Sequence, residues 1–212
     1  MFFQRVAFWA VGLTIGTNSA VLGSPLANPN GASPASLRPR ITADDIQFTP
    51  GPGLPSLESL NLTAVELVEK ALLEIERNEP VGPEPSPASR LTRRAATCWA
   101  PPAGSFYRSA ALACANYLDA LGNTPCELFP SHPSQYYSSV FCSITIGGDP
   151  YNRATVEGIN PVGNFYTQSY CRHVAHAVRL VEWDCRISVL RATNGHEFAY
   201  GNGNLQVGTY LK

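Results

Sequence analysis

Two pairs of neighbouring residues and one set of cysteines have side chains that could do chemistry. His173 and His176 are three residues apart, a spacing at which two imidazoles on one helix can share a metal ion. His196 stands next to Glu197, and an imidazole and a carboxylate can serve as a general base and acid. The cysteines all lie after residue 94, at Cys98, Cys114, Cys126, Cys142, Cys171 and Cys185.

The residues around the two helical histidines argue against a metal site. Arg172 and Arg179 flank them, and no acidic residue lies nearby on the same helix face. A zinc site needs at least three protein ligands. The sequence therefore predicts that His173 and His176 are solvent-facing histidines, and that the chain binds no metal and no cofactor.

His196 and Glu197 are expected on a strand, where adjacent side chains point to opposite faces. They do not converge easily on one substrate atom, and the chain has no nucleophile motif such as GxSxG. The sequence thus predicts no catalytic residue. The enzyme alternative that remains is a small secreted hydrolase of the ribonuclease type, using His196 or Glu197.

The cysteines indicate disulfide bonds. None has the CxxC spacing of a redox or zinc motif, and an even number in a small secreted domain indicates a disulfide framework. Three bridges are predicted, and spacing alone does not decide among the possible pairings.

The N-terminus has the three parts of a secretory signal peptide. Met1–Arg5 carries one positive charge, Val6–Ile15 is apolar, and Val21 and Gly23 suit a cleavage site. The apolar run is too short to cross a membrane, which takes about 20 residues. Residues 1–23 are therefore predicted to be removed, and the product is expected to be secreted and extracellular, with no membrane span.

Residues 24–94 are predicted to form a proline-rich, largely disordered pro-segment with one amphipathic helix over residues 63–77. They hold 11 of the 18 prolines, and the flanks of the helix cannot bury enough apolar surface to offset the entropy of ordering. Thr63 and Glu66 fit a capping box at the start of the helix. A lone helix of this length is marginal in water, so its apolar stripe is expected to pack on a partner, which the following domain can supply. Asn61 begins the only glycosylation sequon of the chain.

Arg93 and Arg94 end this segment. The pair resembles the sites of furin- and kexin-type processing proteases, and it separates a proline-rich composition from a cysteine-rich one. A chance pair in a polar linker is the alternative. The hypothesis is that cleavage after Arg94 frees residues 95–212, and that residues 24–94 assist folding or mask a surface.

Residues 95–212 are predicted to alternate helices and strands. Asn194-Gly195 is a hairpin signal, and Gly201 to Asn204 marks another turn. An antiparallel sheet with helices on one face predicts an α+β fold, a two-layer sandwich of that sheet and two helices, stapled by disulfides. The predicted helices cover 105–121 and 170–184, and the predicted strands cover 139–146, 154–157, 186–193, 197–200 and 205–211.

This arrangement resembles fungal small secreted cysteine-rich proteins. Within them it is similar to the virally encoded killer toxins of smut fungi and to effectors with the same two-helix sandwich. The resemblance covers residues 95–212, including the closing GNGNLQVGTYLK. It implies secretion and action on the cells of another organism, by ion-channel interference or as a virulence effector. Such toxins rely on exposed lysines, whereas this domain has only Lys212, so no functional residue is transferred.

The charge balance of residues 95–212 is neutral, with seven basic and seven acidic side chains. Nucleic-acid binding usually needs a basic excess, so no nucleic-acid partner is predicted. The favoured hypothesis is a monomeric effector- or toxin-like protein that binds a host or competitor protein or glycan. A cell-wall glycan-binding protein is a further alternative.

Aromatic residues cluster in the central part of the domain. Most are expected in the core, and those near Gly147-Gly148 and Asn164 are candidates for a binding surface. The cluster consists of Phe129, Tyr136, Tyr137, Phe141, Tyr151, Phe165, Tyr166 and Tyr170.

Overall fold

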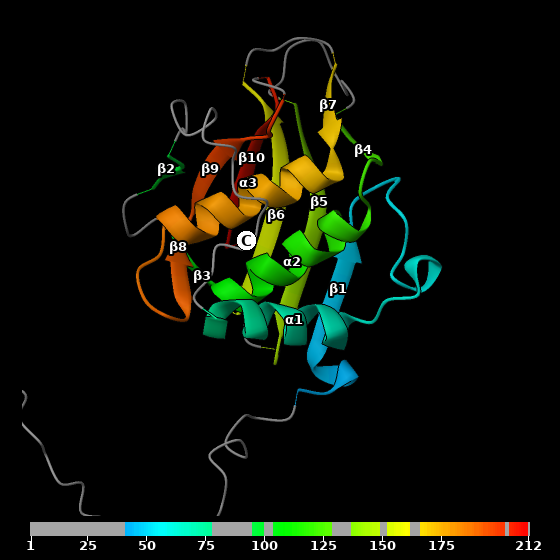
Figure 1. Cartoon of the computed structure of the whole chain (residues 1–212), viewed down its shortest axis with the longest axis vertical. Coiled ribbons are helices and arrows are strands. Elements are labelled where there is room, and N and C mark those ends of the chain that lie inside the picture. The colour runs from blue at the N-terminus through cyan, green and yellow to red at the C-terminus, as the bar shows by residue number, and fades with distance from the viewer. Residues whose placement is uncertain are drawn as a thin grey trace, which may run out of the picture. The chain divides into compact units, whose positions relative to one another are not determined.

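The centre of the structure is a six-stranded antiparallel sheet with three helices on one face (Figure 1). The computed structural model describes residues 41–77, 95–99, 104–128, 137–148, 152–161, 166–201 and 204–211, all within the unit Arg40–Lys212. The predicted signal peptide 1–23 and the pair Arg93-Arg94 lie outside the described residues.

The described helices and strands follow one another in this order: β1 Ile46–Pro50, α1 Ala64–Arg77, β2 Thr97–Cys98, β3 Ser105–Tyr107, α2 Arg108–Ala120, β4 Pro125–Leu128, β5 Tyr137–Ile146, β6 Arg153–Asn160, β7 Thr167–Tyr170, α3 Cys171–Asp184, β8 Arg191–Thr193, β9 Gly195–Phe198 and β10 Gln206–Tyr210. Two short 3₁₀ helices are also present. Ala43–Asp45 lies directly before β1, and Glu58–Leu60 lies between β1 and α1.

The large sheet has the order β1-β5-β6-β10-β9-β2, and two smaller sheets pair β3 with β8 and β4 with β7. All of these pairs are antiparallel. The predicted α+β, disulfide-stapled two-layer sandwich is confirmed, with a third helix in the layer that covers the sheet.

Helix α1 begins as the sequence predicts. Thr63 and Glu66 form the capping box, with Glu66 Oε2 accepting from the Thr63 N–H at 2.8 Å and Thr63 Oγ1 accepting from the Glu66 N–H at 3.2 Å. The apolar stripe of α1 is buried against α2, so the partner expected for this helix is the cysteine domain itself.

The prediction of a flexible linker before α1 is wrong for Ile46–Pro50, which forms the edge strand β1. Ile46 pairs with Ile146 and Phe48 with Ile144 on β5, and the Phe48 ring lies 4.9 Å from that of Tyr117. Pro50 ends the strand at the sheet edge, where proline is tolerated. The burial of alternate apolar residues therefore outweighs the proline-rich composition around them.

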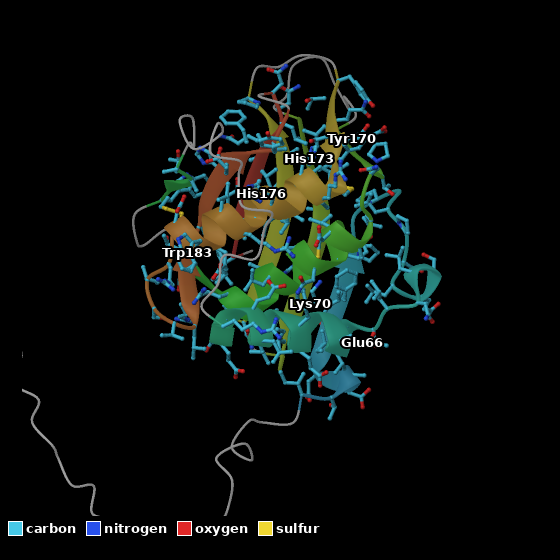
Figure 2. All side chains as sticks on the ribbon, viewed as in Figure 1. Glu66, Lys70, Tyr170, His173, His176 and Trp183 are labelled. Atoms are coloured by element: carbon cyan, nitrogen blue, oxygen red, sulfur yellow. A yellow bond between two sulfur atoms is a disulfide. The ribbon has the colours of Figure 1, made fainter. Side chains whose placement is uncertain are left out.

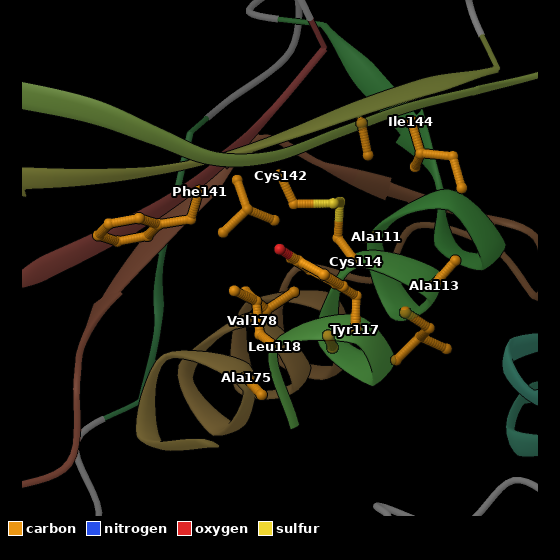
Figure 3. Close-up of a cluster of buried hydrophobic side chains, with 14 of the residues drawn as sticks. Ala111, Ala113, Cys114, Tyr117, Leu118, Phe141, Cys142, Ile144, Ala175 and Val178 are labelled. Atoms are coloured by element: carbon orange, nitrogen blue, oxygen red, sulfur yellow. A yellow bond between two sulfur atoms is a disulfide. The ribbon is translucent and has the colours of Figure 1, made fainter. Parts of the chain in front are cut away.

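Helix α2 is buried on all sides. Every residue from Ala110 to Leu118 is buried, and four of them are alanines, which let neighbouring elements approach closely. Figure 3 shows Cys114 bonded to Cys142 on β5, with Tyr117 and Leu118 among the surrounding apolar side chains. This helix is the centre of the core.

All six cysteines form disulfide bonds, as the sequence predicts. The bridges are Cys98–Cys185, Cys114–Cys142 and Cys126–Cys171. Two of these bridges lie at the ends of helix α3, because Cys171 is its first residue and Cys185 directly follows its last. A disulfide therefore holds each end of this helix.

Two predicted boundaries in the domain are wrong. Ser105 does not cap a helix but lies in β3, and Tyr107 precedes the first residue of α2. The predicted strand 186–193 is reduced to Arg191–Thr193, because the N–H groups of Ile187 and Ser188 both donate to the Arg191 carbonyl and close a turn.

The predicted hairpin turn at Asn194-Gly195 is also wrong. Its flanking strands β8 and β9 belong to different sheets. Asn194 is buried, and its Oδ1 accepts from the Leu211 N–H at 3.0 Å. Gly195 is needed for a close approach, since a Cβ there would lie 2.7 Å from Cys185 Sγ and 2.9 Å from the Thr97 carbonyl oxygen.

Gly195→Ala is expected to lower the free energy of unfolding by about 1–3 kcal/mol, because the added methyl group would push β2 and the Cys98–Cys185 bridge away from β9. Urea denaturation of the purified protein measures this change. Gln206→Ala, at a half-buried position of the adjacent strand, is the control and should have a much smaller effect. Equal midpoints for Gly195→Ala and the unmodified protein would contradict the packing described.

Candidate functional site

An exposed group of aromatic side chains lies at the N-terminal end of α3. We call it the tyrosine patch, and it consists of Tyr170, Arg172, His173 and Tyr200. The two tyrosines are 47% and 62% exposed. Figure 2 shows Tyr170, the last residue of β7, close to His173 on the first turn of α3.

The backbone beneath the patch is held by three kinds of bond. Tyr170 pairs with Pro125 in the β4–β7 sheet, and the next residue forms the Cys126–Cys171 bridge. The first N–H groups of α3, which have no partner within the helix, donate to the carbonyls of Thr124 at 2.9 Å and Gly122 at 3.1 Å. The patch therefore stands on a fixed base.

The side chains of the patch contact one another. The His173 ring lies edge-on between Tyr170 at 5.5 Å and Tyr200 at 5.6 Å, measured between centroids. The Arg172 guanidinium lies 5.6 Å from the centroid of the Tyr170 ring, within the range of a cation–π contact. These contacts restrict side chains that would otherwise lose rotamer entropy on binding.

His173 is a neutral member of this group. Burial, and then the charge of Arg172, lower the pKa of its imidazole, while a backbone hydrogen bond at Tyr200 partly offsets both. A neutral imidazole between two tyrosines offers one donor and one acceptor rather than a charge. The patch thus combines aromatic faces with hydrogen-bonding groups and one fixed cation, a combination that suits protein or sugar recognition.

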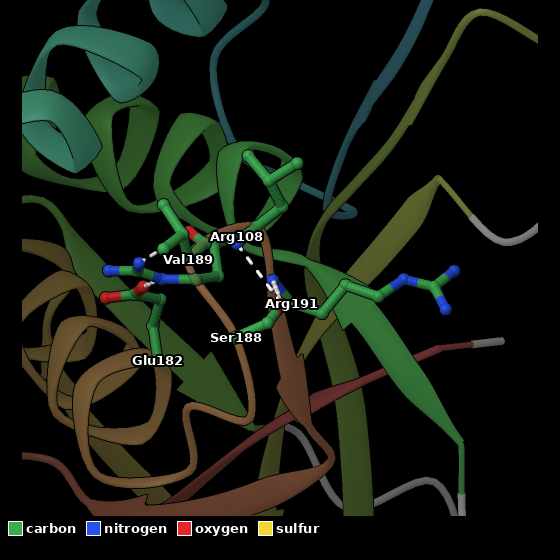
Figure 4. Close-up of polar contacts among 6 residues, drawn as sticks. Arg108, Glu182, Ser188, Val189 and Arg191 are labelled. Atoms are coloured by element: carbon green, nitrogen blue, oxygen red, sulfur yellow. Dashed lines mark hydrogen bonds and ion pairs between the residues drawn. The ribbon is translucent and has the colours of Figure 1, made fainter.

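A second exposed surface is the apolar loop 186–190, which joins α3 to β8. Ile187, Val189 and Leu190 are 55%, 69% and 55% exposed. Figure 4 shows the buried side chain of Arg108 paired with Glu182 and bonded to the Val189 carbonyl, at 2.7 Å. The loop is therefore held from beneath by a buried ion pair while its apolar side chains face outward.

The structure separates His196 from Glu197, as the strand periodicity predicts. Glu197 is buried and opposes Val207, on the side of the sheet that faces the helices. Gly208 of β10 is paired with Glu157 of β6 on one side and with His196 of β9 on the other. Paired residues point to the same face, so His196 and Glu157 both lie on the face of the sheet that is turned away from the helices. The Tyr210 ring lies over Gly208, and burial, then the charge of Glu157, raise the Tyr210 pKa to about 12.

His196 is suited to act as a proton acceptor. Burial lowers the pKa of its imidazole, and its Nδ1 atom has no hydrogen-bond partner among the described residues. The Trp99 ring lies 6.2 Å from it and 5.0 Å from Tyr210. The acid on the same sheet face is Glu157, a residue that the sequence analysis did not select.

The structure bears on three further predictions: the absence of a metal site, the glycosylation site and the absence of a membrane span. His173 and His176 both lie on α3, and the part of the chain that the structure describes contains no cluster of three or more potential metal ligands. Asn61 is exposed in the turn before α1, and its glycosylation stays a prediction. None of the described helices is both long enough and apolar enough to cross a membrane.

Of the aromatic cluster predicted from the sequence, Phe141 is buried and Tyr166 and Tyr170 are exposed. For Tyr137 only the backbone is described, and the others, Phe129, Tyr136, Tyr151 and Phe165, lie outside the described residues. Tyr200 is not among the residues predicted for a binding surface, although its position beside Gly201, at the start of a predicted turn, is a signal of exposure.

The fold and the site define a disulfide-stapled α+β sandwich that carries a fixed, exposed aromatic patch. Residues 93–210 match the family described as Domain of unknown function (DUF8794), and the protein belongs to this family. Neither the curated proteins nor the solved structures contain a match to the chain.

Arg172→Gln is expected to raise the His173 pKa toward its ordinary value of 6.5, because it removes the charge that opposes protonation. NMR titration of the imidazole measures the shift, and Arg186→Gln, at the far end of α3, is the control. The unfolded chain binds the proton more strongly than the folded one, so the free energy of unfolding should fall as pH drops below 6.5. Since burial also lowers the His196 pKa, the fall in stability should become smaller in His173→Gln but not disappear. An unchanged pH dependence in that variant would show that His173 does not contribute.

Proposed function

We propose that the protein is a secreted effector- or toxin-like binding protein, matured at Arg93-Arg94, which acts on another organism by binding a host or competitor protein or glycan. The observation on which this rests is the tyrosine patch. Two large aromatic side chains, Tyr170 and Tyr200, are exposed there on either side of His173. The backbone at Tyr170 is fixed by a disulfide and by strand pairing.

Exposed aromatic side chains on a rigid base support a binding role. Tyrosine buries a large area at a small cost in rotamer entropy, and binding energy concentrates in such side chains. The contacts among Tyr170, His173 and Tyr200 already order the patch before a partner arrives. The apolar loop 186–190 offers a second surface of the same kind.

Secretion and processing are parts of the same proposal. Three disulfides suit an oxidising compartment, and the N-terminal residues have the pattern of a signal peptide. The family match begins at Arg93, and the proposed cut lies directly after the next residue, Arg94. The resemblance to killer toxins and effectors supplies the expected kind of target, namely the cells of another organism.

Tyr170→Ala and Tyr200→Ala are each expected to weaken the response of target cells by roughly 30-fold in dose, which corresponds to a hot-spot loss of about 2 kcal/mol. Dose–response curves on candidate host or competitor cells measure this, with unmodified and fully reduced protein run beside the variants. Leu73→Ala, at an exposed apolar position of α1, is the matched control and should leave the curve in place. Full potency of both tyrosine variants would remove the patch from the proposal.

A second candidate function is acid–base hydrolysis of RNA, favoured by the shared face of His196 and Glu157. They lie on strands either side of β10, so their backbones are about 10 Å apart. Gly208 has no side chain of its own between them, but the Tyr210 ring lies over it, so this ring would have to move for a substrate to reach both groups. The Trp99 ring lies beside His196. A neutral imidazole and a carboxyl group could accept and donate a proton on opposite sides of one substrate.

If the protein cleaves RNA, His196→Ala and Glu157→Gln should each lower the rate by about 100-fold or more. Glu197→Gln should retain the rate, since this residue faces the helices, and a thermal melt of each variant controls for folding. Digestion of RNA by the purified secreted protein is the assay. A preparation without activity, or one in which only Glu197→Gln is inactive, would exclude this candidate.

A further inference from the structure

Residues 41–77 are built into the fold, although they precede the proposed cut. We propose that after cleavage at Arg94 the segment with β1 and α1 stays bound to residues 95–212, so that the mature protein consists of two noncovalently associated chains. This inference rests on the proposed processing, and it replaces the hypothesis of a pro-segment that is removed.

Strand β1 completes the sheet. It pairs with β5 over five positions, from Ile46 with Ile146 to Pro50 with Cys142. Two further backbone bonds extend the ladder, from the Gly51 N–H to the Phe141 carbonyl at 2.9 Å and from the Gly147 N–H to the Asp45 carbonyl at 2.6 Å. Loss of β1 would leave β5 as an unpaired edge, a form of sheet that associates readily with other chains.

Helix α1 covers an apolar surface of the cysteine domain. Leu67, Val68, Ala71 and Ile75 are each less than a tenth exposed, and Val68 and Ala71 are not exposed at all. They pack against α2, whose residues from Ala110 to Leu118 are all buried. Burial of apolar surface is the main favourable contribution to association, and release of α1 would expose both sides of this contact.

Polar contacts fix how the segment sits. The Tyr117 hydroxyl donates to the Pro55 carbonyl at 2.6 Å, and Asn116 Nδ2 donates to the Leu67 carbonyl at 3.4 Å. Glu74 is buried, with its Oε2 atom 3.8 Å from Arg179 Nε on α3. Contacts of this kind make the fit specific, because departure of the segment would leave Arg179 without one of its two carboxylate neighbours.

No covalent bond would join the two chains after the cut. Every cysteine lies at Cys98 or beyond, and the three bridges all lie within residues 95–212. Retention therefore depends only on the strand, the helix and the polar contacts above. The two chains should stay together in native buffer and separate in denaturant without any reducing agent.

The experiment uses the full secreted chain with residues 90–94 replaced by the recognition sequence of a site-specific protease. After complete cleavage, native mass spectrometry and gel filtration are expected to show one species that contains both chains, and a non-reducing denaturing gel should show two bands. A cysteine domain that elutes without residues 41–77 would overturn the proposal. Cleavage at the natural pair is measured separately, from the N-terminus of the unmodified secreted protein, so a failure of processing is distinguished from a failure of retention.

Two variants on α1 test whether the described interface holds the chains together. In the cleaved protein, a fluorescent peptide of residues 41–77 is added in excess, and its exchange into the complex reports the dissociation rate. Val68→Ala, at a fully buried position, should speed exchange at least tenfold, whereas Leu73→Ala, 46% exposed on the same helix, should not. Equal rates for the two variants would contradict the interface, and both uncut variants are checked for folding by circular dichroism.

Discussion

The burial of helix α2 from Ala110 to Leu118 is the constraint on which the rest of the structure depends. A stretch of helix with no exposed face must be covered on every side. The sheet covers one side, α3 a second and α1 a third, and the alanines of α2 let all three come close (Figures 1 and 3). The cysteine domain alone therefore lacks one of the three covers, which is why a segment with the composition of a linker forms part of the core.

Two arginines, one buried and one partly buried, align the helices around this centre. Arg108, at the first residue of α2, pairs with Glu182 of α3, and Arg179 of α3 contacts Asn116 and Asp119 of α2 as well as Glu74 of α1. An unpaired buried charge is costly, so each arginine restricts its helix to a position where the partners are present. Arg108, which is paired with Glu182, also donates to the Val189 carbonyl of the apolar loop. The same buried ion pair therefore supports both the packing of the helices and the position of the exposed apolar loop.

The sequence was sufficient where the signal is local. The capping box of α1, the apolar stripe of α3 and the alternation in β5 depend on residues close in the chain, and all three are present in the structure. It was insufficient where distant residues decide. β1 forms because it pairs with β5, a strand about 90 residues further along the chain. Ile187 and Val189 face outward because Arg108 holds the backbone of their loop. The tyrosine patch was predicted only at Tyr170, since Tyr200 reaches His173 only because α3 lies beside the β9–β10 connection.

Helix α3 is fixed by a disulfide at each end, one to β4 and one to β2. A helix tied in this way cannot slide along its axis or rotate by a turn, which are the movements that most often transmit the effect of a ligand through a small protein. If the proposed binding function holds, occupation of the patch at one end of α3 would not be transmitted to the loop at the other. The protein would then act as a rigid ligand, and the change of shape on contact would occur in its partner.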